Sequence, residues 1–407
     1  AHRPAAPPPS PAAMSTGVLP RNLHRIRQVA SKRSDTITLS QLMGMTRTDT
    51  AALIHTAQWL RKQLPIRLAR RIDDFLQLPY VVVCNQNFAQ VVERYLETFD
   101  VVDGFPEIAT DLDELEFREL IRDQVRRHNG VTKDISQGYS ELLALYPDIK
   151  LDAFLDRFFV GKTAINILKT HYVSMASPRP NFVGLVQTDL RPASVVNDLA
   201  APLRRLTHSV YGYAPEVEVR GSVDSTMSYI PHHAQFLVQE VLKNALRATA
   251  ERHRPKGMSL DPPDMPPVRV EVQRGDLHVR ISVSDTGGGI PKKAITNCWR
   301  YGWTTAKGGE DELGANTLGI QNRSRKAELA GFGFGLPLAR LHAKFFGGDM
   351  FLQNMPGHGL DVYLLLGDLT LGSPMTDAAD SSSTLVWEEN TEMEEKLAKL
   401  QEDAAKI

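Results

Sequence analysis

The sequence lacks the marks of several protein classes. Its only two cysteines, Cys84 and Cys298, are too far apart for a paired-ligand spacing. A disulfide framework or a zinc site is therefore not expected, and a reducing compartment fits better. No uninterrupted apolar run is long enough to span a bilayer. The 47 basic and 48 acidic residues nearly cancel, which gives no reason to expect nucleic acid as the main partner.

The N-terminal segment 1–34 contains no Asp or Glu. It carries Arg and Lys among Ala, Ser and Pro, a composition typical of mitochondrial import signals. Pro7, Pro8 and Pro9 oppose a helix in the same segment. A targeting segment and a disordered basic arm therefore both remain open for these residues.

The composition is otherwise globular, with 407 residues, 42% of them hydrophobic, which is enough for two domains. Segment 35–208 has a helical period. Its apolar residues recur three and four positions apart in the stretches 88–99, 120–143, 154–168 and 195–206. Helices with one apolar face bury it by packing together, so we predict an N-terminal all-α, four-helix bundle.

After this segment the period changes to two. Apolar residues alternate at 217–219, 268–272 and 279–283, and 361–366 reads as a last strand. One helix is expected around Glu240, and another begins at Pro337 and ends before Gly347-Gly348. We therefore predict an α+β sandwich over residues 209–371. A Ser/Asp-rich linker and a charged tail containing Trp387 complete residues 372–407.

Asp285 follows the strand predicted at 279–283 and opens the motif Asp-Thr-Gly-Gly-Gly. An ionised carboxylate only accepts hydrogen bonds, so it suits the exocyclic amine of adenine and rejects the carbonyl of guanine. Gly287 and Gly289 let the backbone approach a purine ring without a Cβ in the way. The structural alternative is a capping Asp in a tight glycine turn.

A second glycine-rich segment leads directly into the helix predicted from residue 336. It contains Gly331, Phe332, Gly333, Phe334, Gly335 and Leu336. Its glycines permit positive φ, so that successive amides can turn inward around phosphate oxygens, and the following helix points its N-terminal amides at the same anion. The two phenylalanines are expected to pack beneath the loop.

Glu240 and Asn244 lie four residues apart and share one helix face. An amide oxygen is a hard ligand suited to Mg²⁺, and a carboxylate one turn away can take the proton from an attacking hydroxyl or water. Lys243 and Arg247 are close enough in sequence to favour the ionised carboxylate. The alternative is an exposed polar helix face, which the presence of Asp285 and the two glycine segments in the same chain makes less favoured. The Glu240/Asn244 pair, the Asp285 motif and the second glycine segment, in this order, predict an ATP site.

His128 follows Arg126 and Arg127 in the helical half. Three interpretations remain open for it. One is that it accepts a phosphoryl group, another is that it supports Glu240 as a partner behind the catalytic residues, and the third is a position on the surface, which is the default for a single histidine.

The ordered motifs at Glu240, Asp285 and Gly331 resemble the ATP-binding fold shared by gyrase, Hsp90, histidine kinases and MutL. Within that fold, segments 240–249 and 331–337 look specifically like the mitochondrial 2-oxo acid dehydrogenase kinases, which place a helical bundle before the nucleotide domain. Segments such as 71–79 extend the likeness over nearly the whole chain, and this one looks closer to the branched-chain kinase.

This resemblance implies transfer of the ATP γ-phosphate to a serine of the E1α subunit of such a complex, which inactivates it. It further implies docking on a lipoyl domain of the E2 core, a homodimer, a location in the mitochondrial matrix, and Mg²⁺ with K⁺ as a further candidate ion. Glu240 would be the base, Asn244 the Mg²⁺ ligand and Asp285 the adenine reader. Thr304 and Thr305 would begin a mobile lid over about 304–330.

Three positions depart from the family pattern. Phe236 stands where pyruvate dehydrogenase kinases carry a histidine, Leu360 replaces the usual threonine, and Val386 replaces an aspartate before Trp387. The choice between the pyruvate and branched-chain complexes therefore stays open. So do three other activities on the same fold: a histidine kinase, a hydrolysing ATPase, and a non-catalytic regulator that docks on E2.

Overall fold

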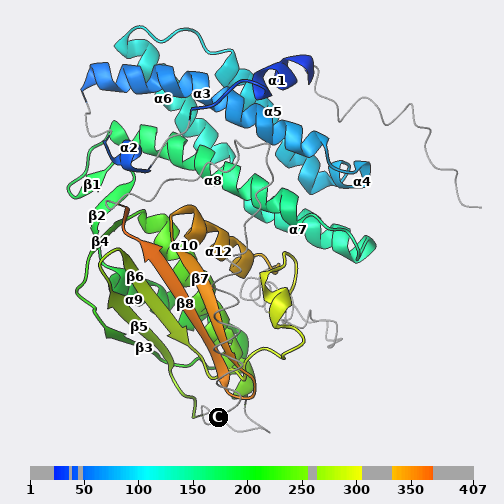
Figure 1. Ribbon diagram of the computed structural model, residues 1–407, viewed down its shortest axis with the longest axis vertical. Coiled ribbons are helices and arrows are strands. Elements are labelled where there is room, and N and C mark those ends of the chain that lie inside the picture. Colours follow the sequence, from blue (N-terminus) through cyan, green and yellow to red (C-terminus); the bar gives the residue numbers. More distant parts are fainter. Residues whose placement is uncertain (1–22, 36–38, 45–48, 255–263, 305–331, 370–407) are drawn as a thin grey trace, which may run out of the picture.

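The computed structural model describes residues 23–35, 39–44, 49–254, 264–304 and 332–369. Within these ranges a helical half lies above a half built on a five-stranded sheet (Figure 1). Most of the predicted targeting segment, lid, linker and tail falls outside the described residues.

The helical half is a bundle of long helices with short flanking ones. Its elements are α1 (Leu23–Ala30), α2 (Leu39–Gly44), α3 (Thr50–Leu76), α4 (Tyr80–Val83), α5 (Gln86–Asp103), α6 (Asp111–Arg127), α7 (Val131–Leu145) and α8 (Asp152–Met175). Helix α3 packs against α5, α6 and α8, and α7 packs against α5 (Figure 1). The predicted all-α bundle is confirmed.

The single stretch expected over 120–143 is two helices. Thr110 and Asp113 form a capping box that starts α6, each side chain accepting a hydrogen bond from the other's backbone N–H. Gly130 then takes a left-handed φ of 90° between α6 and α7. The apolar pattern continued across this break because both helices bury residues in the same core.

Aromatic rings fill the centre of the bundle. Phe75 of α3 lies 5.1 Å from both Phe154 and Phe158 of α8, measured between ring centroids, and it also contacts Phe88 of α5 edge-on. All four rings are buried. Burial of each such ring stabilises the fold by about 1.5–3 kcal/mol relative to an exposed ring.

The second half carries a mixed sheet of order β3-β5-β6-β8-β7. Its strands are β3 (Val217–Gly221), β5 (Val268–Arg274), β6 (His278–Ser284), β7 (Asp349–Met355) and β8 (Gly359–Gly367). Only the β3–β5 pair among these is parallel. A small sheet of β1 (Phe182–Val183), β2 (Val186–Leu190) and β4 (Met227–Tyr229) lies beside the junction of the two halves (Figure 1).

Three helices pack against the five-stranded sheet: α9 (Pro192–Tyr211), α10 (Pro231–Arg252) and α12 (Gly335–Phe345). They cover one face and leave strands visible on the other (Figure 1). This arrangement confirms the predicted α+β sandwich. Helix α9 lies in a stretch that the sequence assigned to the bundle, yet it packs mainly against α10. An apolar stripe predicts a buried face but not the partner that buries it.

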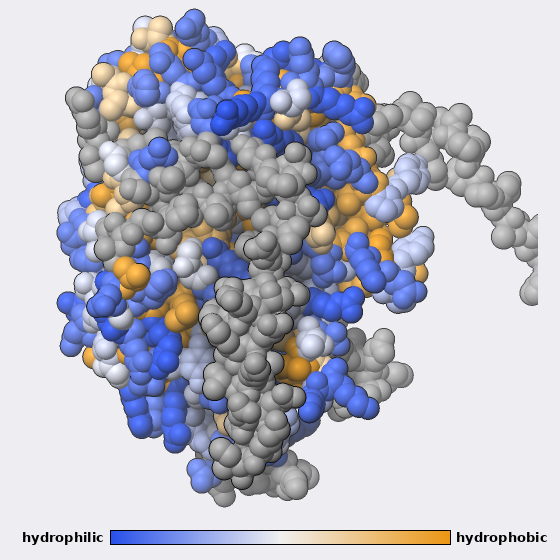
Figure 2. Space-filling view, viewed as in Figure 1, coloured by the Kyte–Doolittle hydropathy of each residue, from blue (hydrophilic) through white to orange (hydrophobic). Residues whose placement is uncertain are grey.

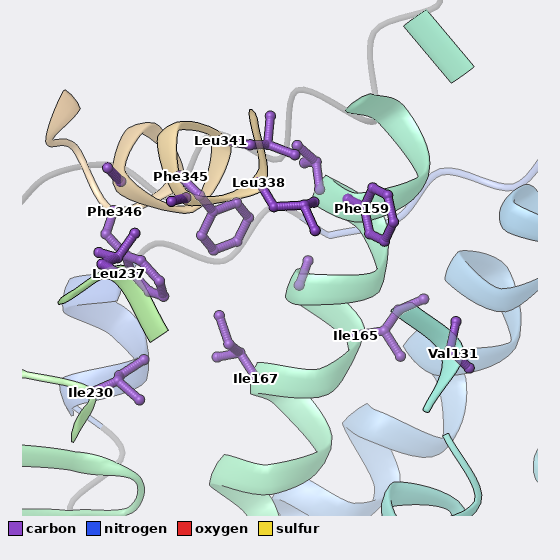
Figure 3. Packing of buried hydrophobic residues seen from close by; sticks show 14 of the residues in the cluster. Val131, Phe159, Ile165, Ile167, Ile230, Leu237, Leu338, Leu341, Phe345 and Phe346 are labelled. Atoms are coloured by element: carbon purple, nitrogen blue, oxygen red, sulfur yellow. The ribbon is translucent and has the colours of Figure 1, made fainter. Parts of the chain in front are cut away.

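The two halves meet where α12 lies against α8. Leu338 and Leu341 of α12 approach the end of α8 that carries Phe159, and all three side chains are buried (Figure 3). The hydrophobic core is therefore continuous from the bundle into the sheet domain. Among the residues that the structure describes, no helix has the length and hydropathy needed to cross a membrane.

Candidate nucleotide site

A cavity of about 360 Å³ opens between α10, the loop after β6 and the start of α12. Ten of the predicted site residues line it: Glu240, Asn244, Arg247, Asp285, Gly287, Gly289, Thr304, Gly333, Gly335 and Leu336. Segments up to about a hundred positions apart in the sequence thus meet around one space. Thr305 and Gly331 lie outside the described residues.

Helix α10 supplies the polar wall of the cavity. It starts with a proline at its first turn, and its apolar residues, such as Leu237 and Leu246, are buried in the core. Glu240 and Asn244 both line the cavity, as their spacing predicted. Lys243 Nζ donates a hydrogen bond to Glu240 Oε1 at 2.8 Å, and both side chains are buried. Lys243 itself does not line the cavity and acts through Glu240.

Asp285 lies one residue beyond the end of β6, with its carboxylate held by backbone amides. Oδ1 accepts hydrogen bonds from the N–H of Gly287 at 2.7 Å and of Leu360 at 3.3 Å. The backbone N–H of Asp285 in turn donates to the carbonyl of Leu360 at 3.0 Å. Burial raises the pKa of Asp285 to about 6, although the two amides act in the opposite direction. Oδ2 keeps its capacity to accept from a ligand amine.

The loop that follows Asp285 is fastened to the turn between β7 and β8. Asn354 accepts from the N–H of Ile290 and donates to its carbonyl, both at 2.7 Å. Gly288 and the turn exchange backbone hydrogen bonds, and Arg252 of α10 donates to the Gly357 carbonyl at 2.7 Å. These contacts hold the loop in place as one wall of the cavity.

The second glycine segment brings backbone against the carboxylate of Glu240. Gly333 has a φ of 75°, which a residue with a Cβ rarely adopts. A Cβ at Gly335 would overlap Oε2 of Glu240, so a larger residue here would displace that carboxylate or the start of the following helix. Helix α12 begins at Gly335, and Gly335, Leu336 and Pro337 of its first turn line the cavity. The first N–H groups of a helix have no partner within the helix, and here Gly335 and Leu336 carry them, because Pro337 has none.

The two phenylalanines of this segment differ. Phe334 is buried, as predicted, whereas Phe332 is 40% exposed. Neither phenylalanine lines the cavity, so the proposed contribution of Phe332 and Phe334 to nucleotide binding is through their backbone amides. Their alternation with glycine could not predict which of the two rings is buried.

His128 lies in the bundle and not in the cavity wall. Its Nε2 is 2.8 Å from the Thr98 hydroxyl, and its ring lies 4.8 Å from that of Tyr95 between centroids. Burial, with Lys169 as the next cause, lowers its pKa to about 2, so the imidazole is neutral. A buried neutral ring in the bundle core is not a surface residue, and we assign it no role in the chemistry at Glu240.

Sequence reasoning missed most of the apolar wall. The residues it did not single out are Val241, Ala245, Ala248, Glu251, Ile290, Pro291, Cys298, Trp303, Pro337 and Val362. Burial raises the pKa of the Cys298 thiol to about 11, so this side chain is neutral and acts as part of that wall. Five of them had a local signal: Val241, Ala245 and Ala248 lie within the motif at 240–249, Pro337 within that at 331–337, and Trp303 directly before Thr304.

Comparisons with known proteins agree with this geometry. Residues 36–187 match the family model described as mitochondrial branched-chain alpha-ketoacid dehydrogenase kinase. Residues 230–369 match the model described as histidine kinase-, DNA gyrase B-, and HSP90-like ATPase. A mitochondrial pyruvate dehydrogenase (acetyl-transferring) kinase of Arabidopsis thaliana is 35% identical over 322 residues, which cover 78% of this chain and 86% of that protein. The chain belongs to the mitochondrial 2-oxo acid dehydrogenase kinase family.

Animal relatives of this kinase extend the match. Isozyme 4 of mitochondrial pyruvate dehydrogenase kinase is 29% identical over 329 residues in Homo sapiens, covering 77% of this chain and 76% of that protein. In Rhinolophus ferrumequinum the same isozyme is 27% identical over 373 residues, covering 88% and 86%. The kinase is therefore an ATP-dependent enzyme, and the mitochondrial names of its relatives support a mitochondrial location.

Proposed function

We propose that this kinase transfers the γ-phosphate of ATP to a serine of the E1α subunit of a mitochondrial 2-oxo acid dehydrogenase complex and thereby inactivates it. One observation carries the proposal: a single cavity is lined by Asp285, the buried carboxylate of Glu240 and the glycines that precede α12. The pyruvate complex is the first substrate to test, because the relatives above are named for it.

The branched-chain complex is the second candidate. The family model that matches the helical half is named for the branched-chain enzyme. Phe236, one turn before Glu240, is an aromatic residue whose ring lies 5.0 Å from that of His342 between centroids. Pyruvate dehydrogenase kinases carry a histidine at the position of Phe236, and a phenylalanine side chain cannot exchange a proton as that histidine can. This difference from the pyruvate enzymes favours the branched-chain complex.

Nucleotide recognition is divided between two parts of the cavity wall. Oδ2 of Asp285 accepts the hydrogen bond from the exocyclic amine of adenine, and Gly287 and Gly289 lie beside the ring. The amides around Gly333 and Gly335, together with the start of α12, donate to phosphate oxygens. Thr304 and Arg247 complete the predicted contacts from the cavity wall.

In the transfer step, Glu240 accepts the proton of the attacking serine hydroxyl. A bond forms between the serine Oγ and the γ-phosphorus while the bond from that phosphorus to the bridging oxygen breaks, and ADP leaves. Lys243 holds Oε1 of Glu240, which leaves Oε2, next to Gly335, as the oxygen that takes the proton.

The cavity offers a donor set that suits Mg²⁺. Asn244 presents a neutral hard oxygen on the same helix face as Glu240, and the nucleotide phosphates would supply further ligands. When bound there, Mg²⁺ neutralises charge on the phosphates. K⁺ is a further candidate ion, which the family resemblance implies.

We further infer the assembly that the family resemblance implies: docking of the helical half on a lipoyl domain of E2, a homodimer, and residence in the matrix. We propose the uncovered face of the five-stranded sheet as the surface of the homodimer contact. Over β3 and β5 this face is mostly hydrophilic (Figure 2), but Phe351 of β7 is 37% exposed. Analytical ultracentrifugation of wild type and Phe351→Glu tests the dimer, which the charge should weaken.

Incubation with γ-labelled ATP and purified E1 from the pyruvate and branched-chain complexes, side by side, tests the proposed reaction. Acid-stable label on one E1α supports a serine kinase and identifies its substrate. Acid-labile label on the enzyme itself would instead indicate a histidine kinase. Release of labelled phosphate without labelled E1 would indicate an ATPase, and regulation that survives Glu240→Gln would indicate a docking regulator.

A further inference from the structure

Four aromatic rings join the helical half to the nucleotide site. Tyr301 precedes Gly302, Phe334 lies between Gly333 and Gly335, and the centroids of their two rings are 5.0 Å apart. Phe159 of α8 lies 6.1 Å from each of them, and Tyr139 of α7 meets Phe334 edge-on at 6.0 Å. All four side chains are buried. The bundle thus contributes two of the four rings in this cluster, Tyr139 and Phe159.

A polar contact fixes Tyr301 in this cluster. Its hydroxyl donates to Oδ1 of Asp156 on α8 at 2.7 Å, and its backbone N–H donates to Oδ1 of Asp152 at 3.4 Å. Burial raises the pKa of Asp156, and the hydrogen bond from the tyrosine opposes that rise. A hydroxyl bonded to a half-buried carboxylate has one favoured position, whereas a ring held by apolar packing alone can shift more freely.

The cluster is directly continuous with the catalytic wall. The N–H of Gly302, next to Tyr301, donates to the carbonyl of Gly333 at 3.2 Å. Phe334 immediately precedes Gly335, whose Cα lies against Oε2 of Glu240. A shift of Tyr301 is therefore transmitted through Gly302 and Gly333 to the position of Gly335 beside the carboxylate.

We propose that Tyr301 is a positioning residue for phosphoryl transfer. Through Asp156 it ties the phosphate end of the cavity to α8, and so sets the distance between the glycine wall and Glu240. Misplacement of reacting groups by about 1 Å costs up to about a hundredfold in rate, so a modest shift here is measurable. This inference rests on the proposed nucleotide site and adds to it a support from the helical half.

The test compares full-length Tyr301→Phe with a matched control, Tyr172→Phe. The hydroxyl of Tyr172 likewise donates to a carboxylate of the bundle, Glu114 Oε1 at 2.7 Å, and its ring packs against Phe117 of α6. Neither tyrosine lines the cavity, but Tyr172 is not one of the four rings of the cluster. Calorimetry with ATP plus Mg²⁺ and with adenosine, together with kcat on E1, separates the two ends of the site. We expect Tyr301→Phe to lower kcat about tenfold and ATP affinity severalfold with adenosine affinity unchanged, and Tyr172→Phe to change none of them.

A double-mutant cycle with Asp156→Ala, which removes the accepting oxygen, tests whether Tyr301 acts through this contact. The Tyr301→Phe/Asp156→Ala double variant should lose no more than the larger single loss, because both changes break one contact. Additive losses, equal loss of adenosine and ATP binding, or a kcat equal to that of the control would overturn the positioning role. If the wild type binds neither ATP nor adenosine, the proposed nucleotide site itself is wrong. If the wild type binds both and Tyr301→Phe changes neither kcat nor ATP affinity, the site stands and the positioning role of Tyr301 is wrong.

Discussion

Lys243 and Glu240 form a buried ion pair one turn apart on α10, with 2.8 Å between Nζ and Oε1. The pair leaves Oε2 of Glu240 facing Gly335, where a Cβ would not fit. One carboxylate oxygen is therefore held by its own helix and the other is aimed at the wall that receives phosphate. This geometry divides the residues of the cavity into those needed for transfer and those needed for binding.

Glu240→Gln should abolish transfer and leave ATP binding close to normal. The amide can still accept a hydrogen bond from Lys243, so the local fold is kept, but it cannot take a proton. We expect kcat to fall by about a hundredfold or more, as for loss of a general base. Labelled transfer to E1 and calorimetry with ATP measure the two effects.

Glu251→Gln is the matched control for that change, because Glu251 is another carboxylate of α10 that lines the same cavity. It should leave kcat within a few-fold of wild type. Equal loss of ATP binding and transfer in Glu240→Gln would contradict the assignment of Glu240 as the base.

Gly335→Ala should impair transfer more than adenine recognition. The added Cβ would overlap Oε2 of Glu240, so that the carboxylate or the start of α12 must move. We expect kcat to fall about tenfold or more, with adenosine affinity unchanged. Gly44→Ala, which meets no atom within 4 Å, is the control and should behave as wild type. An unchanged kcat in Gly335→Ala would show that this contact is not needed.

Adenosine binding should weaken as the pH falls through about 6. Burial raises the pKa of Asp285 to about 6, and only its ionised form accepts the adenine amine without competition from its own proton. Affinity should thus be constant above this pKa and fall about tenfold per pH unit well below it. Adenosine is the ligand of choice because it has no phosphate to titrate in this range. A pH-independent Kd between pH 5 and about 8 would contradict the role of Asp285.

Leu360→Thr should tighten ATP binding. Leu360 lines the cavity, and its backbone N–H donates to the carboxylate of Asp285, so a hydroxyl at this position would lie close to the adenine edge. One added hydrogen bond contributes about 1 kcal/mol, or about fivefold in Kd. Leu360→Val, which adds no polar group, is the control. An unchanged Kd in Leu360→Thr would remove the claim that the leucine weakens nucleotide binding.

The sequence pattern predicted the helical bundle and the sheet domain, but it did not predict where every helix ends or every strand. Single apolar stripes predicted the bundle, and strict alternation predicted β5 and β6. The turn at Gly130 was invisible because hydrophobicity continues on both sides of it. Strand β7 was missed because its residues Phe351 and Gln353 are exposed and its apolar positions do not alternate cleanly.

The polar half of the site was predictable because its chemistry demands particular residue types at short spacing. Glu240 with Asn244, and Asp285 with its glycines, are local motifs. The contact of Tyr301 with Asp156 joins residues 145 positions apart, and neither residue type is unusual where it stands. Such contacts depend on how α8 and the glycine wall pack together, which no local pattern encodes.

The most direct test of the nucleotide site is calorimetry of the purified chain with ATP and Mg²⁺, repeated with Asp285→Ala and with GTP in place of ATP. We predict saturable heat for wild type with ATP, little for wild type with GTP, and none for Asp285→Ala. Equal heats for wild type and Asp285→Ala, or no heat for wild type with ATP, would contradict the account.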